Sequence, residues 1–145
     1  MFGPLPRLYR LLIVVVAVVA FLGAGAWVAQ LSAGQEITLP ELLFEQGQTV
    51  LPPTARVALD ALAAALQDQP SLRLAVQGHT DNQGNAELNR QLSQLRAEKV
   101  CLYLTAHGVA AERLRPIGYG GTRPVADNAD PAQRPRNRRV VLVPQ

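Results

Sequence analysis

The stretch from residue 72 to residue 107 reads LRLAVQGHTDNQGNAELNRQLSQLRAEKVCLYLTAH. Across residues 72–77, apolar side chains alternate with polar or small ones, which is the period of two expected of a half-buried strand. Gly78 ends this strand, and a loop rich in Gly, Asn and Asp follows. Residues 86–107 contain neither Pro nor Gly, so they predict a long helix, with Gly108 as its C-terminal stop.

The sequence on either side of this stretch predicts one more helix and three more strands. The strands are expected at residues 36–39, 114–119 and 139–143, and an alanine-rich helix at 54–69, between the Pro52-Pro53 pair and Pro70. The order of elements is then βαβαββ. This order predicts an α/β (α+β) two-layer sandwich, in which both helices cover one face of a mixed four-stranded sheet.

An apolar segment precedes the predicted domain. Residues 11–31 carry no charged side chain, and as a helix they are long enough to cross a bilayer. Basic residues precede this segment and acidic residues follow it, so the positive-inside rule places the N-terminus in the cytoplasm; these residues are Arg7, Arg10, Glu36 and Glu41. We expect a cytoplasmic N-terminus (1–10), one transmembrane helix (11–31), a linker (32–35) and one exported domain (36–145).

The fate of this leader has two interpretations. Ala24-Gly25-Ala26 has the small-x-small form of a signal peptidase site, and cleavage there leaves a periplasmic or outer-membrane-associated protein. Trp27 and the apolar residues after it prolong the segment beyond an ordinary signal core and suit a membrane interface. We favour a retained single-pass anchor in a bacterial inner membrane. No cysteine follows the leader closely, which excludes a lipoprotein anchor.

Composition excludes several classes of function. Cys101 is the only cysteine, so the chain has no intramolecular disulfide and no zinc site of the paired-cysteine kind, and we expect neither a cofactor nor a metal. Its apolar neighbours predict that Cys101 is a small buried residue. Arginines are concentrated from residue 113 onward, but the exported topology and the lack of interleaved aromatic residues argue against nucleic acid as a partner.

Polar side chains on the long predicted helix point to a ligand site. Asn89, Ser93 and Arg96 share one helical face with the apolar Val100, so the face begins polar and ends apolar. This pattern indicates a core that opens into a polar pocket, or else two solvated first turns. Asp81, in the preceding loop, offers an acceptor for an ammonium group, and Arg96 offers a planar fork for a carboxylate. Together they suit both ends of an amino-acid zwitterion.

Several motifs in one order resemble the family of OmpA C-terminal-like domains. They are Leu43-Phe44-Glu45-Gln46-Gly47 with Leu51-Pro52, Gly78-His79-Thr80-Asp81 with Gly84, Asn89-Arg90-Gln91-Leu92-Ser93-Gln94-Leu95-Arg96-Ala97, Gly118-Tyr119-Gly120, Pro124-Val125-Ala126-Asp127-Asn128 and Asn137-Arg138-Arg139-Val140. The resemblance spans residues 36–143. It departs from the large outer-membrane members at the N-terminal end, where no barrel strands occur, and from the lipoprotein members in the missing cysteine.

The resemblance implies non-covalent binding of peptidoglycan through the diaminopimelate residue of its stem peptide. It implies that Asp81 pairs with the ligand ammonium and Arg96 with its carboxylate, and that Thr80 and Asn89 line or brace the site beside the basic Arg138. With the leader, it predicts a protein that tethers a membrane to the cell wall. Its expected partners are peptidoglycan, the membrane and other envelope proteins.

Two other functions are compatible with parts of this sequence. An enzyme would use His79 and Asp81, with His107 as a third group, as acid, base or metal ligands, but His107 lies at the far end of the long helix. We therefore expect no catalysis, and we expect His79 to order its loop through its ring nitrogens. A stator-like or envelope-complex subunit would use the same domain for wall attachment. Such a subunit needs an ionisable residue in the membrane, which a partner would have to supply. Leader cleavage, oligomeric state and a signalling role stay open.

Overall fold

The computed structural model describes residues 29–39, 47 and 49–145. The expected cytoplasmic N-terminus and all but the last three residues of the expected transmembrane helix lie outside these residues. Within the described part, no helix is long and apolar enough to span a membrane.

The described helices and strands follow the predicted order. They are β1 (Ile37–Leu39), α3 (Pro53–Gln67), β2 (Leu74–His79), α4 (Ala86–Ala106), β3 (Leu114–Gly118) and β4 (Arg139–Pro144), with two short 3₁₀ helices, η2 (Ala111–Arg113) and η3 (Arg134–Arg136). The βαβαββ order is therefore confirmed. Both 3₁₀ helices lie in connections that the sequence pattern left as loops.

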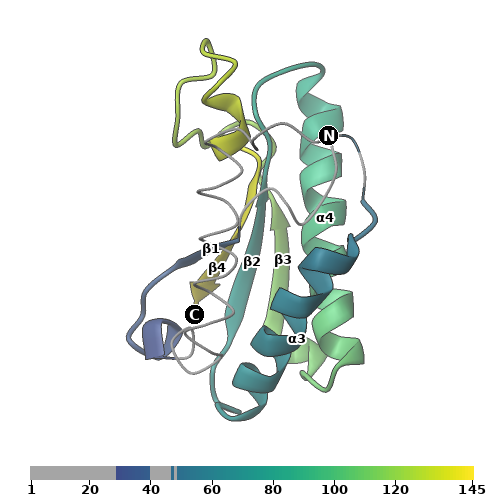
Figure 1. Cartoon of the computed structure of the whole chain (residues 1–145), viewed down its shortest axis with the longest axis vertical. Helices are drawn as coiled ribbons and strands as arrows, with labels where there is room; N and C mark the ends of the chain where they lie inside the picture. Colours follow the sequence, from purple (N-terminus) through teal and green to yellow (C-terminus); the bar gives the residue numbers. More distant parts are fainter. Residues whose placement is uncertain (1–28, 40–46, 48) are drawn as a thin grey trace, which may run out of the picture.

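The four strands form one mixed sheet in the order β1-β4-β2-β3. β2 and β3 are parallel and joined through α4, whereas β4 runs antiparallel to both β1 and β2. α3 and α4 lie together against one face of this sheet (Figure 1). The expected α+β sandwich with a mixed four-stranded sheet is confirmed.

The core lies between the sheet and the two helices. Leu74 and Val76 of β2 face the helices, as does Leu142 of β4, and all three are buried. From α3, residues at helical spacing complete the layer; they are Leu59, Leu62 and Leu66. Burying each such side chain contributes about 1.5–3 kcal/mol, so this layer supplies much of the driving force for folding.

α4 is fixed at both ends by local chemistry. At its start, the Asn85 side chain accepts a hydrogen bond from the backbone N–H of Leu88 at 3.0 Å, which is an N-cap. At its end, Gly108 adopts a φ of +96°, a value that favours glycine. Cys101 is buried in the core, as predicted, and this burial together with the charge of Glu98 raises the pKa of its thiol to about 12.

Two glycines let α4 lie directly on the sheet. A Cβ added at Gly78 of β2 would lie 2.1 Å from the carbonyl oxygen of Ser93, and one added at Gly118 of β3 would lie 2.4 Å from the backbone nitrogen of Gln94. Both contacts are far closer than van der Waals packing allows. The helix backbone therefore approaches β2 and β3 at the strand ends where the loop with Asp81 begins.

A capped helix end joins the N-terminal side to the domain. Residues 29–32 are helical, and Gly34, with a φ of +77°, closes this helix. Gln35 N donates to Gln30 O at 2.9 Å and Gly34 N donates to Leu31 O at 3.0 Å, which is the Schellman pattern. Leu31 is only 1% exposed and belongs to the hydrophobic core. The residues expected as a linker are thus a fixed turn beside β1.

Candidate functional site

The loop after β2 holds a buried carboxylate. Asp81 is 8% exposed. Its Oδ1 accepts a hydrogen bond from the backbone N–H of Gln83 at 3.0 Å, and its Oδ2 lies 3.4 Å from Nη1 of Arg138, which precedes β4. Arg138 therefore forms an ion pair with Asp81. The resemblance implied only that Arg138 is a basic residue near the site, and the structure places it in direct contact.

The segment that follows β3 braces the same loop. Thr80 N donates to Gly120 O at 2.9 Å, and the Thr80 hydroxyl donates to Asp81 O at 2.8 Å. Gly121 lies so close that an added Cβ would be 2.6 Å from Asp81 O. Thr80 thus braces the backbone around Asp81.

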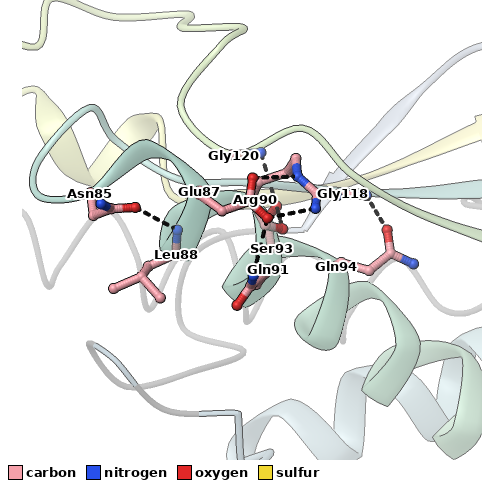
Figure 2. Close-up of polar contacts among 9 residues, drawn as sticks. All are labelled: Asn85, Glu87, Leu88, Arg90, Gln91, Ser93, Gln94, Gly118 and Gly120. Carbon is pink, nitrogen blue, oxygen red and sulfur yellow. Dashed lines mark hydrogen bonds and ion pairs between the residues drawn. The ribbon is translucent and has the colours of Figure 1, made fainter.

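The first turns of α4 complete the frame. Asn89 is partly buried, and its Nδ2 donates to Gln83 O at 2.7 Å, so it supports the turn whose N–H contacts Asp81. One turn further, the Ser93 hydroxyl donates to Arg90 O and accepts from Gly120 N at 2.9 Å. Figure 2 shows that α4 is tied in this way to the segment after β3. Asn89 is therefore linked to the Asp81 loop through Gln83.

Opposite charges on the exposed side of the same turns pair with each other. Arg90 and Glu87 form two hydrogen bonds, at 3.0 and 2.7 Å, and Gln91 Nε2 donates to Glu87 at 3.0 Å (Figure 2). These bonds, first that from Arg90 and then that from Gln91, lower the pKa of Glu87 to about 2. Gln94 faces the sheet instead, and its Oε1 accepts from Gly118 N at 2.7 Å.

Arg96 is a buried cation on the inner face of α4. It is 6% exposed, and Ser93 and Val100 on the same face are fully buried. The face therefore runs from polar to apolar within the molecule, and only the residues before Ser93 are solvated in part. Thr80, Asp81, Asn89 and Arg138 are linked to one another, in part through Gln83. Arg96 follows Asn89 on the same side of α4, about two turns further along the helix.

His79 does not order its loop through its ring nitrogens, so that expectation is wrong. Among the described residues, neither ring nitrogen of His79 has a hydrogen-bond partner, although the side chain is 3% exposed. The ring stacks on Tyr119 at 5.4 Å between centroids, and Arg123 lies 3.7 Å above the Tyr119 ring. Burial, followed by the charges of Arg139 and Arg123, lowers the pKa of His79 to about 4.

His107 lies in a separate contact between the two helices. Its Nε2 is 3.5 Å from the Asp60 carboxylate of α3, and its ring stacks on Tyr103. It therefore does not converge with His79 and Asp81. Within the described residues, no group of three or more His, Cys, Asp or Glu side chains is placed to hold a metal ion.

Asn137 is a structural residue of the site that sequence reasoning missed. It is fully buried, and its Oδ1 accepts hydrogen bonds from Val125 N and Ala126 N at 2.8 and 2.9 Å. Its Nδ2 donates to Ala126 O and to Asn128 Oδ1. This one side chain organises the connection between β3 and β4 and thereby fixes Arg138, the next residue. Only its place in the Asn137-Arg138-Arg139-Val140 motif hinted at a role.

Comparisons with known proteins agree with this architecture. A family model described as the OmpA family matches residues 43–138, more than half of the chain. Outer membrane porin F of Pseudomonas fluorescens is 40% identical over 100 residues, which cover 69% of this chain and 31% of the porin. Peptidoglycan-binding protein ArfA of Mycobacterium tuberculosis is 37% identical over 112 residues, covering 77% of this chain and 34% of ArfA.

A solved structure of similar fold is that of a putative MotB-like protein from Desulfovibrio vulgaris. Its TM-score is 0.69 at 30% sequence identity, and the match covers 76% of this chain and 72% of that one. The chain spans about a third of the length of the two curated relatives named above. The likeness is therefore to one domain of those longer proteins.

Proposed function

This chain belongs to the OmpA family, and we propose that it binds peptidoglycan non-covalently, through the diaminopimelate residue of the stem peptide, and tethers a membrane to the cell wall. The relative ArfA, 37% identical over 112 residues, is named as peptidoglycan-binding. The observation that carries the proposal is the buried carboxylate of Asp81, held in a braced loop at the start of α4.

Asp81 suits the ammonium group of diaminopimelate. Its Oδ1 is oriented by the backbone N–H of Gln83, so the carboxylate needs no ordering when a ligand binds. Its contact with Arg138, at 3.4 Å, is longer than the 2.7–2.9 Å of an optimal charged hydrogen bond. A ligand ammonium can therefore share Oδ2 with Arg138.

Arg96 suits the carboxylate at the same stereocentre. A guanidinium presents a planar fork of donors that matches a carboxylate, and burial at 6% exposure strengthens the interaction by excluding water. In this proposal Thr80 and Asn89 hold the Asp81 loop against α4, through the hydrogen bonds of Thr80 to Asp81 O and of Asn89 to Gln83 O. The two charges are thereby held at a fixed separation.

The membrane side of the tether is proposed from the leader. A retained apolar helix over residues 11–31 would hold the domain at the periplasmic face of an inner membrane, with a cleaved signal peptide as the alternative. We propose no catalytic role. The names of the relatives above are those of a porin and a binding protein, not of enzymes.

A second candidate function is a stator-like or envelope-complex subunit that uses the same domain for wall attachment. The fold similarity to the putative MotB-like protein, at a TM-score of 0.69 and 30% identity, favours this alternative. Both functions share the peptidoglycan site and differ in what the N-terminal part assembles with.

The test is sedimentation of the full chain, in mild detergent, with insoluble peptidoglycan sacculi. We expect the wild-type chain to pellet and Asp81→Asn and Arg96→Gln each to weaken binding by about tenfold or more, because each removes one charge of the grip. Asp127→Asn and Arg115→Gln, at exposed positions outside the site, are the matched controls and should pellet like the wild type. Circular dichroism confirms that each variant is folded.

A second comparison separates diaminopimelate recognition from general adhesion. Sacculi whose stem peptides carry lysine in place of diaminopimelate lack the side-chain carboxylate and should retain the wild-type chain more weakly. Equal binding to both wall types, or full binding by folded Asp81→Asn, would refute the proposed site. Failure of the folded wild-type chain to pellet with either wall type would refute wall attachment itself.

A further inference from the structure

The long helix α4 exposes large apolar side chains on the face that it turns away from the sheet. Leu88, Leu95 and Leu102 are 63%, 47% and 62% exposed, and they follow one another at intervals of seven residues. Leu92, on the same side, is half-buried, and within the described residues it neither belongs to the core nor packs against it. These four leucines are called the leucine seam below; they extend over about 21 Å of helix.

The spacing of the leucine seam is that of a helix built to pack on another helix. Positions 88, 92, 95, 99, 102 and 106 are separated alternately by four and three residues, which is the a/d spacing of a coiled coil. Leucine occupies each of the three d positions, and Lys99 occupies one a position. Single exposed leucines are common on folded proteins, but several on one line of a helix mark an interaction surface.

We propose that the leucine seam is a self-association surface, on which α4 of a second copy packs antiparallel. Two copies related by a two-fold axis present the same seam to each other, so the surface is its own partner. When the two helices cross at Ala97, each of the six a and d positions of one copy lies opposite another of these positions in the second copy. Leu92 then lies against Leu102 of the second copy, and Leu95 lies against its Lys99.

The charges along α4 select the second copy and its antiparallel direction. In a parallel pair, Lys99 would face the same lysine of the other copy, and two ammonium groups would repel each other. In the antiparallel pair, the Lys99 stem covers Leu95 of the other copy, and its ammonium reaches the adjacent turn, which carries Glu98. Arg90 is already paired with Glu87 within its own helix, so it opposes neither arrangement.

The dimer should be weak and concentration-dependent, because one helix pair buries less surface than a stable dimer needs. Figure 1 shows α4 along one side of the molecule, where it contacts α3 with its C-terminal half. Leu88, Leu95 and Leu102 are exposed in the presence of α3, so a second copy can approach without moving α3.

Cross-linking of the full chain in membranes tests both the surface and the direction. Two differently tagged chains, one with Leu92→Cys and the other with Leu102→Cys, are co-expressed in a Cys101→Ala background. We expect a bismaleimide to join the two tags efficiently and to join Leu92→Cys chains to each other poorly. The reverse pattern, with Leu92→Cys joined mainly to itself, would overturn the antiparallel arrangement.

Loss of the seam should abolish the cross-link. Adding Leu95→Glu to both chains places a carboxylate in the centre of the seam and should lower the cross-linked fraction by about tenfold, because a buried charge is costly. The matched control is Val57→Glu, since Val57 is 65% exposed on α3 and lies off the seam. Undiminished cross-linking by folded Leu95→Glu chains would disprove the proposal. Folding is checked by circular dichroism, and sacculus binding is scored separately.

Discussion

At the scale of single residues, buried polar groups with defined partners control the geometry of the site. Asn137 is the clearest example, because one amide satisfies two backbone N–H groups and one carbonyl of the same connection. Asp81 has a similar position, with one oxygen on a backbone N–H and the other near a guanidinium. A loop that contains such anchors is specific in shape even though it has no regular secondary structure.

Asn137→Ala should lower the free energy of unfolding by about 2–4 kcal/mol. It leaves the N–H groups of Val125 and Ala126 without their acceptor, and each unsatisfied buried donor costs about 1–3 kcal/mol. Urea unfolding measures the loss. The control is Asn82→Ala, at an exposed position of the other loop, which should change stability by less than about 0.5 kcal/mol. Equal effects of the two variants would contradict the role given to Asn137.

His79 should make stability depend on pH in the mildly acidic range. Its pKa falls from 6.5 to about 4 in the folded chain, so the unfolded chain takes up the proton first. Stability is therefore complete above pH 6.5 and is lost as pH falls toward 4, by at most about 1.4 kcal/mol per pH unit. Unfolding experiments at about pH 7.5 and pH 5 measure this loss.

His79→Phe keeps an aromatic ring on Tyr119 but removes the titrating group. The difference in stability between the two pH values should shrink in this variant and persist in the control, His107→Phe, which leaves His79 in place. An unchanged pH dependence in His79→Phe would show that other groups cause it.

Residue-scale features were only partly predictable from the sequence. The alternation and helical spacing correctly placed Ser93, Arg96 and Val100 on the inner face of α4. The same patterns do not show which loops lie next to each other in the folded chain. They could therefore not reveal that Arg138, 57 residues away, contacts Asp81. His79 was misjudged for a related reason, because its surroundings are set by Tyr119 and by an arginine on a neighbouring strand.

At the scale of elements, the distance between α4 and the sheet is set by glycine. Gly78 and Gly118 remove the side chains that would separate the helix from β2 and β3. Gln94 can therefore accept a hydrogen bond from Gly118 N at the end of β3, and Ser93 can accept one from Gly120 N just after it. The resulting frame holds the Asp81 loop between helix and sheet.

Gly78→Ala should cost about 3 kcal/mol of stability, because the added Cβ meets the backbone of Ser93 and the helix must move. Gly84→Ala is the comparison: its φ is +81° but no atom lies within 4 Å of the added Cβ, so only backbone strain of about 1 kcal/mol is expected. Thermal unfolding ranks the two. A smaller cost at Gly78 than at Gly84 would mean that helix and sheet can separate freely.

Element boundaries were largely predictable because local signals coincide with them. Pro53 begins α3 and Gly108 follows α4, and the observed strands agree with the predicted ones within two residues at each end. The 3₁₀ helices η2 and η3 were not foreseen, since three residues are too few to establish a periodicity. Their positions depend on tertiary contacts, such as that of Arg113 with the carbonyls at the end of α3.

At the scale of the whole molecule, the core extends further toward the N-terminus than the sequence pattern indicated. The apolar run that ends at residue 31 is long enough for a membrane span. A leucine at its end can pack equally well in a protein core, so composition alone does not show whether Leu31 belongs to the membrane helix or to the domain. The structure places Leu31 among the core residues, although it precedes residue 36, where the domain was expected to start.

Leu31→Ala should therefore destabilise the domain by about 2–4 kcal/mol, as expected for a buried leucine. Urea unfolding of the full chain in mild detergent, followed by circular dichroism, measures the effect. Val50→Ala removes a side chain that is 70% exposed and should be nearly silent. If Leu31→Ala is equally silent, Leu31 is not part of the folded unit.

The turn that follows Leu31 also determines how the molecule would carry mechanical load. This turn leads into the start of β1, whereas the Asp81 loop follows the end of β2. Because β4 runs antiparallel to both β1 and β2, the turn and the Asp81 loop lie at opposite ends of the sheet (Figure 1). Tension between them acts along the strand axes. The hydrogen bonds between β1 and β4 are then strained together in shear rather than opened one at a time, so even a three-residue edge strand resists being peeled away.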